Sequence, residues 1–299
     1  MIKTIGFIGL GVMGLPQACN LVKAHFEVFG FNRSRPERIN KFVASGGFLS
    51  DSIAETVRTA DVVITMLPDW PDVEQVVLGP DGVVDNAKPG TLIIDMTTVS
   101  ALFSRELHDK LKARSFRMLD APVSGGEPKA IDGTLSIMVG GSKENFEEAL
   151  PVFRAMGTTI NLIGEIGAGS ICKTCNQQLV MANMAAISET LTFAAKAGVD
   201  PELVFNAIKA GLAGSAVLDA KGPRMLVGDI KPGGVLKYHM KDLVNTSAVA
   251  SQTHMPMPVH AAVSQIIQAC MSDGLGDTDH SCLIRYYEKT TGTKVRKFE

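Results

Sequence analysis

The stretch Gly167-Ala-Gly-Ser-Ile-Cys-Lys173-Thr-Cys-Asn176-Gln177 opens a helical pattern that continues to about Lys196. Short β-branched runs alternate with helical patterns before this stretch, and almost only helical patterns follow it. A helix of roughly 27 residues would be about 40 Å long, which is enough to join two domains. The sequence therefore predicts an α/β domain over residues 1–164 and an all-helical domain over residues 165–299.

The first turns of this long helix carry a candidate site. Apolar residues cover most of its circumference, so we expect the helix to be largely buried. Lys173, Asn176 and Gln177 stand three and four residues apart, which places them on one face. A lysine and two amides on a buried helix at a domain junction are typical of a binding or catalytic site.

Composition excludes several classes of protein. The chain has 299 residues, a hydrophobic fraction of 45% and a formal net charge of −2, and its basic residues are scattered. We therefore expect no nucleic-acid partner and no membrane association. Five cysteines, a sparse and odd set, favour a reducing compartment and a cytoplasmic protein. Cys172 and Cys175 are more simply packing residues than a redox or zinc pair, because no second ligand pair accompanies them, and we expect no resident metal.

A glycine-rich turn follows the first predicted strand. The run Thr4 to Gly9 reads as a buried strand, Gly9-Leu10-Gly11-Val12-Met13-Gly14 follows at once, and helical periodicity starts at Leu15. In this context the first glycine permits a tight turn, the second lets a pyrophosphate approach the backbone, and the third allows close packing of helix on strand. An ordinary glycine-rich turn is the alternative, but the strand–turn–helix context favours a Rossmann-type, doubly wound dinucleotide-binding domain.

The end of the second predicted strand indicates which dinucleotide is preferred. An NAD site usually places an acidic residue there to bind the ribose 2′-hydroxyl. This chain has Asn32-Arg33-Ser34 instead. Arginine and serine can bond a 2′-phosphate, which a carboxylate would repel. We therefore predict that NADP(H) is preferred over NAD(H), against the alternative of a solvated basic loop.

Three further loops follow predicted strands, at the edge where doubly wound sheets bind ligands. Met66-Leu67-Pro68 ends one strand, and Thr97 follows another. Ser124-Gly125-Gly126 follows the strand Arg117 to Asp120 and offers backbone N–H groups to an anion, unless it is only a flexible connector. In the helical domain, where we expect helices over residues 201–211, 236–253, 258–272 and 279–290, Lys241 reads by itself as part of a solvated Lys–Asp pair.

Four segments together resemble the β-hydroxyacid dehydrogenase family, which includes 3-hydroxyisobutyrate dehydrogenase and 2-hydroxy-3-oxopropionate reductase. They are Gly6-Phe-Ile-Gly-Leu-Gly-Val-Met-Gly14, Asp120-Ala-Pro-Val-Ser-Gly-Gly126, Gly167 to Asn176, and Lys241-Asp-Leu243. The resemblance spans nearly the whole chain. It implies a dinucleotide domain, an all-helical second domain and an active site in the cleft between them.

The resemblance also implies roles for individual residues. Lys173 matches the family's catalytic lysine, Asn176 an amide that helps to place the substrate, and Ser124-Gly125-Gly126 the loop for the substrate carboxylate. Thr97 matches a residue beside the nicotinamide, and Lys241 a lysine near cofactor and substrate. Gln177 departs from the family, which usually repeats asparagine there, and this difference could alter substrate fit.

Taken together, the sequence predicts an NADP(H)-preferring oxidoreductase that interconverts a small β-hydroxy acid and its semialdehyde, with Lys173 as the acid–base group. The partners expected are a small carboxylate-bearing substrate and further copies of the chain, as a homodimer or homotetramer. The alternatives are a non-catalytic NADPH-binding sensor or scaffold on the same fold, and a relative that acts on another small carbonyl such as an imine. Lys173 argues against the imine reductases, which generally lack that lysine.

Overall fold

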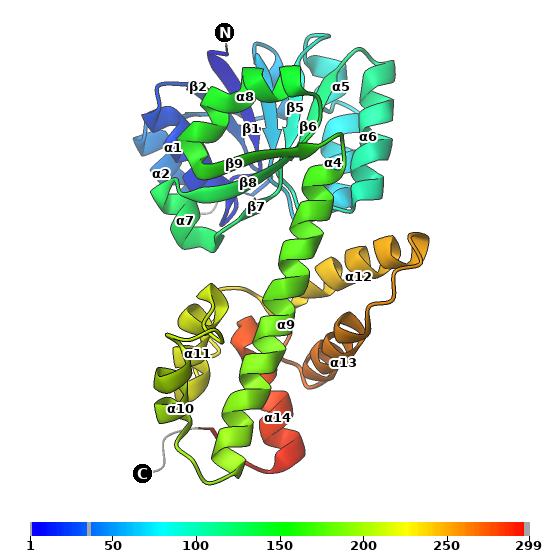
Figure 1. Ribbon diagram of the computed structural model, residues 1–299. Helices are drawn as coiled ribbons and strands as arrows, with labels where there is room; N and C mark the ends of the chain where they lie inside the picture. The colour runs from blue at the N-terminus through cyan, green and yellow to red at the C-terminus, as the bar shows by residue number, and fades with distance from the viewer. Residues whose placement is uncertain (1, 35–36, 296–299) are drawn as a thin grey trace. The chain divides into compact units, whose positions relative to one another are not determined.

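The computed structural model describes residues 2–34 and 37–295, which fall into two compact units that divide between Lys173 and Thr174. The division lies within helix α9 (Ala168–Lys196), the helix predicted from the opening stretch. The sequence analysis had placed the division between residues 164 and 165, just before this helix. The predicted class is confirmed, because a Rossmann-type α/β unit precedes a helical one (Figure 1).

The first unit is built on one sheet with the order β3-β2-β1-β4-β5-β6-β8-β7, and β9 pairs with β8. Pairing is parallel from β3 to β6, so the carboxyl ends of these strands lie along one edge; β8 runs antiparallel to β6 and β7. The strands are β1 (Thr4–Ile8), β2 (Glu27–Phe31), β3 (Phe48–Leu49), β4 (Val62–Thr65), β5 (Leu92–Asp95), β6 (Arg117–Asp120), β7 (Val123–Ser124), β8 (Leu135–Gly140) and β9 (Gly157–Gly164).

Helices cover both faces of this sheet (Figure 1). Alternate residues of a strand point to opposite faces, so Val62 and Ile64 of β4 enter one core and Val63 enters the other. Burial on both sides explains the continuous apolar runs of β4 and β5. One face packs on α1 (Gly14–Lys23), α2 (Asn40–Ala44), α7 (Gly126–Asp132) and α8 (Lys143–Met156); the other packs on α3 (Ile53–Val57), α4 (Trp70–Leu78), α5 (Val83–Asn86) and α6 (Ala101–Ala113).

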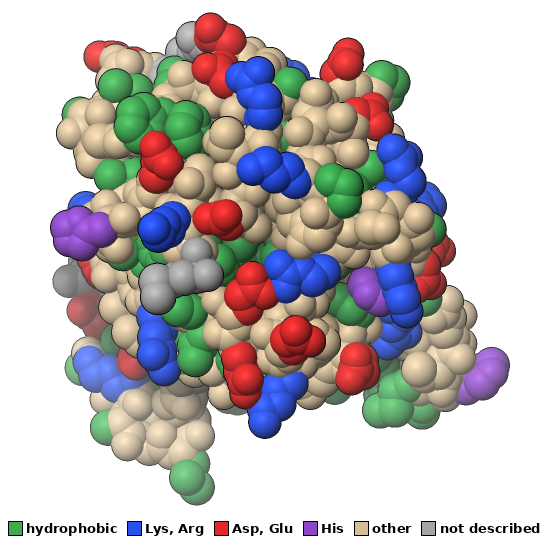
Figure 2. Space-filling view, turned by 90° about the horizontal axis from the view of Figure 1, so that it is seen from above, with side chains coloured by type: hydrophobic (Ala, Val, Ile, Leu, Met, Phe, Trp, Pro, Cys, Tyr) green, Lys and Arg blue, Asp and Glu red, His purple; other side chains and the backbone are tan. Residues whose placement is uncertain are grey.

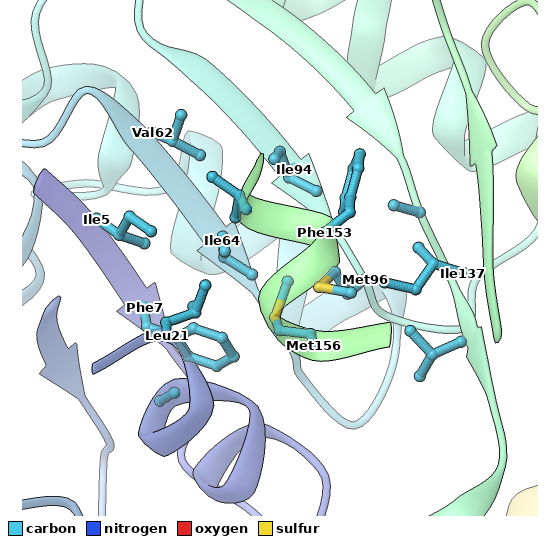
Figure 3. Packing of buried hydrophobic residues seen from close by; sticks show 14 of the residues in the cluster. Ile5, Phe7, Leu21, Val62, Ile64, Ile94, Met96, Ile137, Phe153 and Met156 are labelled. Carbon is cyan, nitrogen blue, oxygen red and sulfur yellow. The ribbon is translucent and has the colours of Figure 1, made fainter. Parts of the chain in front are cut away.

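Figure 3 shows how the first of these cores is filled. Phe153 and Met156 of α8 reach the sheet where Ile64, Ile94 and Met96 project from it, and all five side chains are fully buried. The core therefore fixes the central strands, and with them the loops at their carboxyl ends.

The second unit is helical apart from an isolated bridge between Val235 and Asp279 in the described residues. The later turns of α9 supply Met181, Met184 and Leu191 to its core, beside Phe205 and Ile267. The other helices are α10 (Pro201–Ile208), α11 (Ala216–Val227), α12 (Leu236–Gln252), α13 (Pro258–Ser272) and α14 (Ile284–Thr291), with 3-10 turns η1 (Glu37–Ile39) in the first unit and η2 (His280–Leu283) in the second.

Several elements differ from the sequence reading. Helix α11 was not predicted; it contains Gly222 and Pro223, and the glycine lies against Phe205, where a Cβ would be 2.6 Å from the ring. Helix α7 and the short elements β3, β7 and α5 were not predicted either. The sequence pattern from Pro36 to Gly46 predicts a helix; Pro36 lies outside the described residues, and the residues after it form only η1 and α2.

Acidic and basic side chains of the described residues are interspersed on the face shown in Figure 2. Within residues 2–34 and 37–295, no helix is both long enough and apolar enough to cross a membrane.

Candidate functional site

The glycine turn between β1 and α1 has the geometry that a pyrophosphate requires. A Cβ on Gly9, whose φ is +104°, would lie 2.3 Å from the Met66 carbonyl oxygen, and one on Gly14 would lie 1.9 Å from the Gly9 carbonyl oxygen. Both positions therefore exclude a side chain. A Cβ on Gly11 would meet nothing within 4 Å. Gly11 faces open space where a phosphate group can approach the backbone, so the turn fits a dinucleotide.

Asn32 fastens this turn to the end of β2. The Leu10 N–H donates to Asn32 Oδ1 at 2.9 Å, and Asn32 Nδ2 donates to the Ser34 carbonyl oxygen. Asn32 therefore organises the loop at the end of β2. The Arg33 side chain is 91% exposed and its guanidinium stands 4.0 Å from Asp72, so it can reach a ligand in solvent.

The loops after β4 and β5 are tied together. The Met66 N–H donates to the Ile8 carbonyl oxygen, and the Leu67 N–H donates to Thr97 Oγ1 at 3.0 Å. Thr97 is 1% exposed, so its hydroxyl holds the neighbouring loop in place. Met66 and Leu67 are half-buried and Pro68 is exposed. This linkage fixes the carboxyl edge of the sheet beside the glycine turn.

Asp95 ends β5, two residues before Thr97, and was not singled out by the sequence analysis. Its Oδ1 accepts from Thr65 Oγ1 at 2.9 Å and from the Thr97 N–H at 3.0 Å. Burial raises the pKa of Asp95 to about 6, and the negative charge of Asp120 on the adjacent strand adds to the rise. Its Oδ2 has no hydrogen-bond partner among the described residues.

Asp120 anchors the start of α9, and its role was also missed. Its carboxylate accepts from the Gly167 N–H at 2.8 Å and from the Ser170 N–H at 2.7 Å. These N–H groups belong to the positive end of the helix, where a carboxylate is favourable. Burial raises the pKa of Asp120 nevertheless. An acidic residue ending an apolar strand at the ligand-binding edge is the sequence signal that could have revealed both Asp95 and Asp120.

Gly169 allows α9 to begin so close to the sheet. A Cβ at this position would lie 2.3 Å from the Met138 carbonyl oxygen and 2.7 Å from that of Asp120. Lys173 follows Ser170 by three residues, one helical turn further along. Lys173 is 8% exposed. The anchored start of α9 therefore holds Lys173 one turn from the carboxyl end of β6.

The loop Ser124-Gly125-Gly126 joins β7 to α7. Gly125 has a φ of +138° and Gly126 a φ of +69°, and both glycines are exposed. A Cβ on Gly125 would lie 2.7 Å from the side chain of Lys129, so this turn requires glycine. Backbone N–H groups in such a turn can bind an anion.

Asn176 and Gln177 belong to the second unit, where they join a buried polar group. Asn176 Nδ2 donates to Gln177 Oε1 at 3.0 Å, and Gln177 Nε2 donates to Asp242 Oδ2 at 2.5 Å. Lys241 is half-buried on α12, next to Asp242. The sequence analysis had placed Asn176 and Gln177 together, but it had not predicted their bond to Asp242.

Comparison with known proteins gives the chain its relatives. Residues 4–164 match the NAD binding domain of 6-phosphogluconate dehydrogenase, and residues 167–287 match the family described as NAD-binding of NADP-dependent 3-hydroxyisobutyrate dehydrogenase. The chain is 35% identical to the 2-hydroxy-3-oxopropionate reductase of Escherichia coli, with 97% of this chain and 99% of the relative covered.

Two further relatives agree. The 2-(hydroxymethyl)glutarate dehydrogenase of Eubacterium barkeri is 35% identical, with 97% of each chain covered. The solved structure of Mycobacterium tuberculosis 3-hydroxyisobutyrate dehydrogenase with L-serine is 33% identical, with a TM-score of 0.85 over 95% of this chain and 99% of that one.

Proposed function

Because the chain belongs to the β-hydroxyacid dehydrogenase family, and is thus an NAD(P)-dependent oxidoreductase acting on hydroxy acids, we propose that it interconverts a small β-hydroxy acid and its semialdehyde. The observation that carries this proposal is the anchoring of α9 on Asp120, which holds Lys173 one turn from the end of a parallel strand. Relatives of this chain are named for 2-hydroxy-3-oxopropionate and 2-(hydroxymethyl)glutarate, which supports a small carboxylic acid as the substrate.

The cofactor supplies the hydride chemistry when it is bound. Gly9, Gly11 and Gly14 would hold its pyrophosphate, and the backbone of Met66, Leu67 and Pro68 would line the same edge. Thr97 and Lys241 are proposed to lie against the cofactor. The buried Thr97 hydroxyl also accepts from the Leu67 N–H. We propose a preference for NADP(H), which is supported by the exposed Arg33 and by the absence of an acidic residue at position 32.

Lys173 is the proposed acid–base group. In the reductive direction its ammonium group donates a hydrogen bond to the substrate carbonyl oxygen, offsets the developing alkoxide charge and delivers the proton. In the oxidative direction the neutral amine accepts the hydroxyl proton. Ser124 and the N–H groups of Gly125 and Gly126 are proposed to bind the substrate carboxylate, and Asn176 to orient the substrate.

A substrate screen tests this proposal. NADPH and NADH oxidation should be followed with tartronate, methylmalonate, succinate and malonate semialdehydes and with glyoxylate, beside NADP-dependent oxidation of 3-hydroxy acids. We expect turnover of at least one semialdehyde. Tight cofactor binding with no turnover of any of them would favour a non-catalytic NADPH-binding protein.

Two variants of Lys173 assign the chemistry. Positioned proton transfer contributes about 10²–10⁴ in rate, so Lys173→Ala should lower kcat by at least the lower bound and leave the cofactor Kd nearly unchanged. Lys173→Arg should rescue poorly, because a guanidinium keeps the charge but does not deprotonate near neutral pH. Near-normal kcat in Lys173→Ala would move the acid–base role to another residue.

A further inference from the structure

A buried polar cluster in the second unit has no role in the chemistry proposed above. Its members come from α9, α12 and η2, and each is at most 9% exposed: Gln177, His239, Asp242 and His280. Buried polar groups are costly unless their hydrogen bonds are satisfied. The direction of each hydrogen bond in the cluster therefore carries information.

Asp242 sets the orientation of Gln177. In its ionised form a carboxylate can only accept hydrogen bonds, so the group 2.5 Å from Asp242 Oδ2 must be the Gln177 nitrogen, Nε2. The Gln177 oxygen then points the other way, where it accepts from Asn176 Nδ2 at 3.0 Å. This bond holds the nitrogen end of the Asn176 amide against Gln177. The Asn176 oxygen is thereby the end directed away from Gln177.

Two histidines pack beside this bond. His239 Nδ1 is 3.3 Å from Gln177 Nε2 and 3.4 Å from Asp242 Oδ2. His239 Nε2 is 2.7 Å from His280 Nδ1, and the two rings stack with centroids 4.7 Å apart. Burial lowers the pKa of His280 to about 3, and its Nε2 has no hydrogen-bond partner among the described residues. The orientation of the Gln177 amide is therefore set by Asp242 rather than by the histidines.

We infer that Gln177 is a positioning residue. Asp242 accepts from the Gln177 nitrogen, so the Gln177 oxygen faces Asn176 and accepts from it, which fixes the end of the Asn176 amide that a substrate hydroxyl can bond. The inference rests on the proposed function, in which Asn176 orients the substrate. The glutamine side chain is long enough to bond both Asn176 and Asp242.

The test exchanges the carboxylate and the amide. Asp242→Asn offers both a donor and an acceptor, so Gln177 can turn over and release Asn176; loss of one oriented hydrogen bond should raise the substrate KM about three- to tenfold, with a smaller change in kcat. Gln177→Glu places two carboxylates together and should be worse. In the double variant the carboxylate at position 177 accepts from both neighbouring amides. We expect the double variant to recover most of the lost KM, with an unchanged melting temperature.

The matched control is Asn183→Ala, which removes an amide on the same helix that donates to the Leu179 carbonyl oxygen; its KM should equal that of the parent. An unchanged KM in Asp242→Asn, or a double variant no better than the single ones, would overturn the inference. Absence of turnover in the parent protein would instead count against the proposed function. In that case NMR of the ¹⁵N-labelled side-chain amide of Asn176 decides. Its resonances should shift in Asp242→Asn and return to their parent positions in the double variant. Resonances unmoved by Asp242→Asn would overturn the inference.

Discussion

Arg33 extends into solvent next to Asn32, which is bonded to the glycine turn, and it is the residue on which the proposed NADP(H) preference depends. Arg33→Ala should raise the KM for NADPH much more than that for NADH. The lost charge-assisted hydrogen bonding to the 2′-phosphate corresponds to about 1–3 kcal/mol of binding free energy. Steady-state kinetics with both cofactors measures this, with Arg58→Ala, another exposed arginine of the first unit, as the control. Equal effects on the two cofactors would show that Arg33 does not read the 2′-phosphate.

Asp95 makes the stability of the first unit depend on pH. Its pKa rises from 3.8 to about 6 on folding, because burial disfavours the charged carboxylate. The folded chain thus binds this proton more tightly than the unfolded chain, so the free energy of unfolding falls as pH rises from about 4 to 6. Asp95→Asn cannot ionise and can still accept from Thr65 and Thr97.

We therefore expect the melting temperature of Asp95→Asn, relative to that of the parent, to be higher at pH 7.5 than at pH 4.5. Thermal unfolding at the two pH values measures this difference. The control is Asp132→Asn at an exposed position, which should show no such dependence. A variant destabilised equally at both pH values would contradict the buried-charge explanation.

Among individual residues, the roles of the glycines could be predicted from the sequence better than those of the acidic residues. The three glycines of the turn could be assigned because each has a spacing and a steric reason that local sequence carries. Asp95 and Asp120 were not assigned: their place at the end of a strand is visible in the sequence, but burial and the effect of one charge on the other across two strands are not. His239 and Asp242, which contact Gln177, likewise lie more than 60 positions further along the chain.

The start of α9 is the element most sensitive to a single added methyl group. In Gly169→Ala the new Cβ would lie 2.3 Å from the Met138 carbonyl oxygen, so the first turn of the helix must move away from β8. Overpacking of this kind typically costs about 1–3 kcal/mol. Urea denaturation should show that loss, and kcat should fall as well, because Lys173 is one turn away.

The matched control is Gly211→Ala, where the nearest atom would be 3.6 Å from the new Cβ. It should change stability little and leave kcat unchanged. Equal stability of Gly169→Ala and the parent would show that the helix start can shift freely.

Elements with strong local signals were the ones that could be predicted. The sequence pattern from Lys143 to Met156 predicts a helix, and α8 has these bounds, with a serine cap at Ser142, although Pro151 lies within it. Helix α11 runs through Gly222 and Pro223, where local signals oppose a helix and packing on Phe205 decides the outcome. Tertiary packing of this kind is not visible in local sequence.

For the whole molecule, we expect self-association through the second unit. Leu179 and Phe193 on α9 are 66% and 71% exposed, and Ala186 stands seven residues from each, so the three form an apolar stripe with heptad spacing. Exposed apolar stripes of this length usually mark an interface. Sedimentation at micromolar concentration should give a dimer or tetramer, and Leu179→Glu with Phe193→Glu should shift it towards the 31.8 kDa chain.

Val43→Glu, at a half-exposed apolar position on α2, is the control and should leave the assembly intact. A parent protein that sediments only as a single chain would refute the expected association. The order of the two units could be predicted from the alternation of strands and helices. Their boundary at residues 164 and 165 stays a prediction, while the helical pattern from Gly167 to Lys196 is continuous across the division within α9.

That continuity has a consequence for anyone who would recombine this protein. Helical hydrogen bonds join each N–H to the carbonyl four residues earlier, so the N–H groups of residues 174–177 are bonded to carbonyls on the other side of the boundary. A chimera spliced between Lys173 and Thr174 would have to rebuild a helix across its seam, with the proposed acid–base lysine inherited from one parent and the proposed substrate amide from the other. Splicing in the residues that precede α9 would instead transfer Lys173, Asn176 and Gln177 as one inherited block, while the loop Ser124-Gly125-Gly126 would stay with the parent that supplies the first unit.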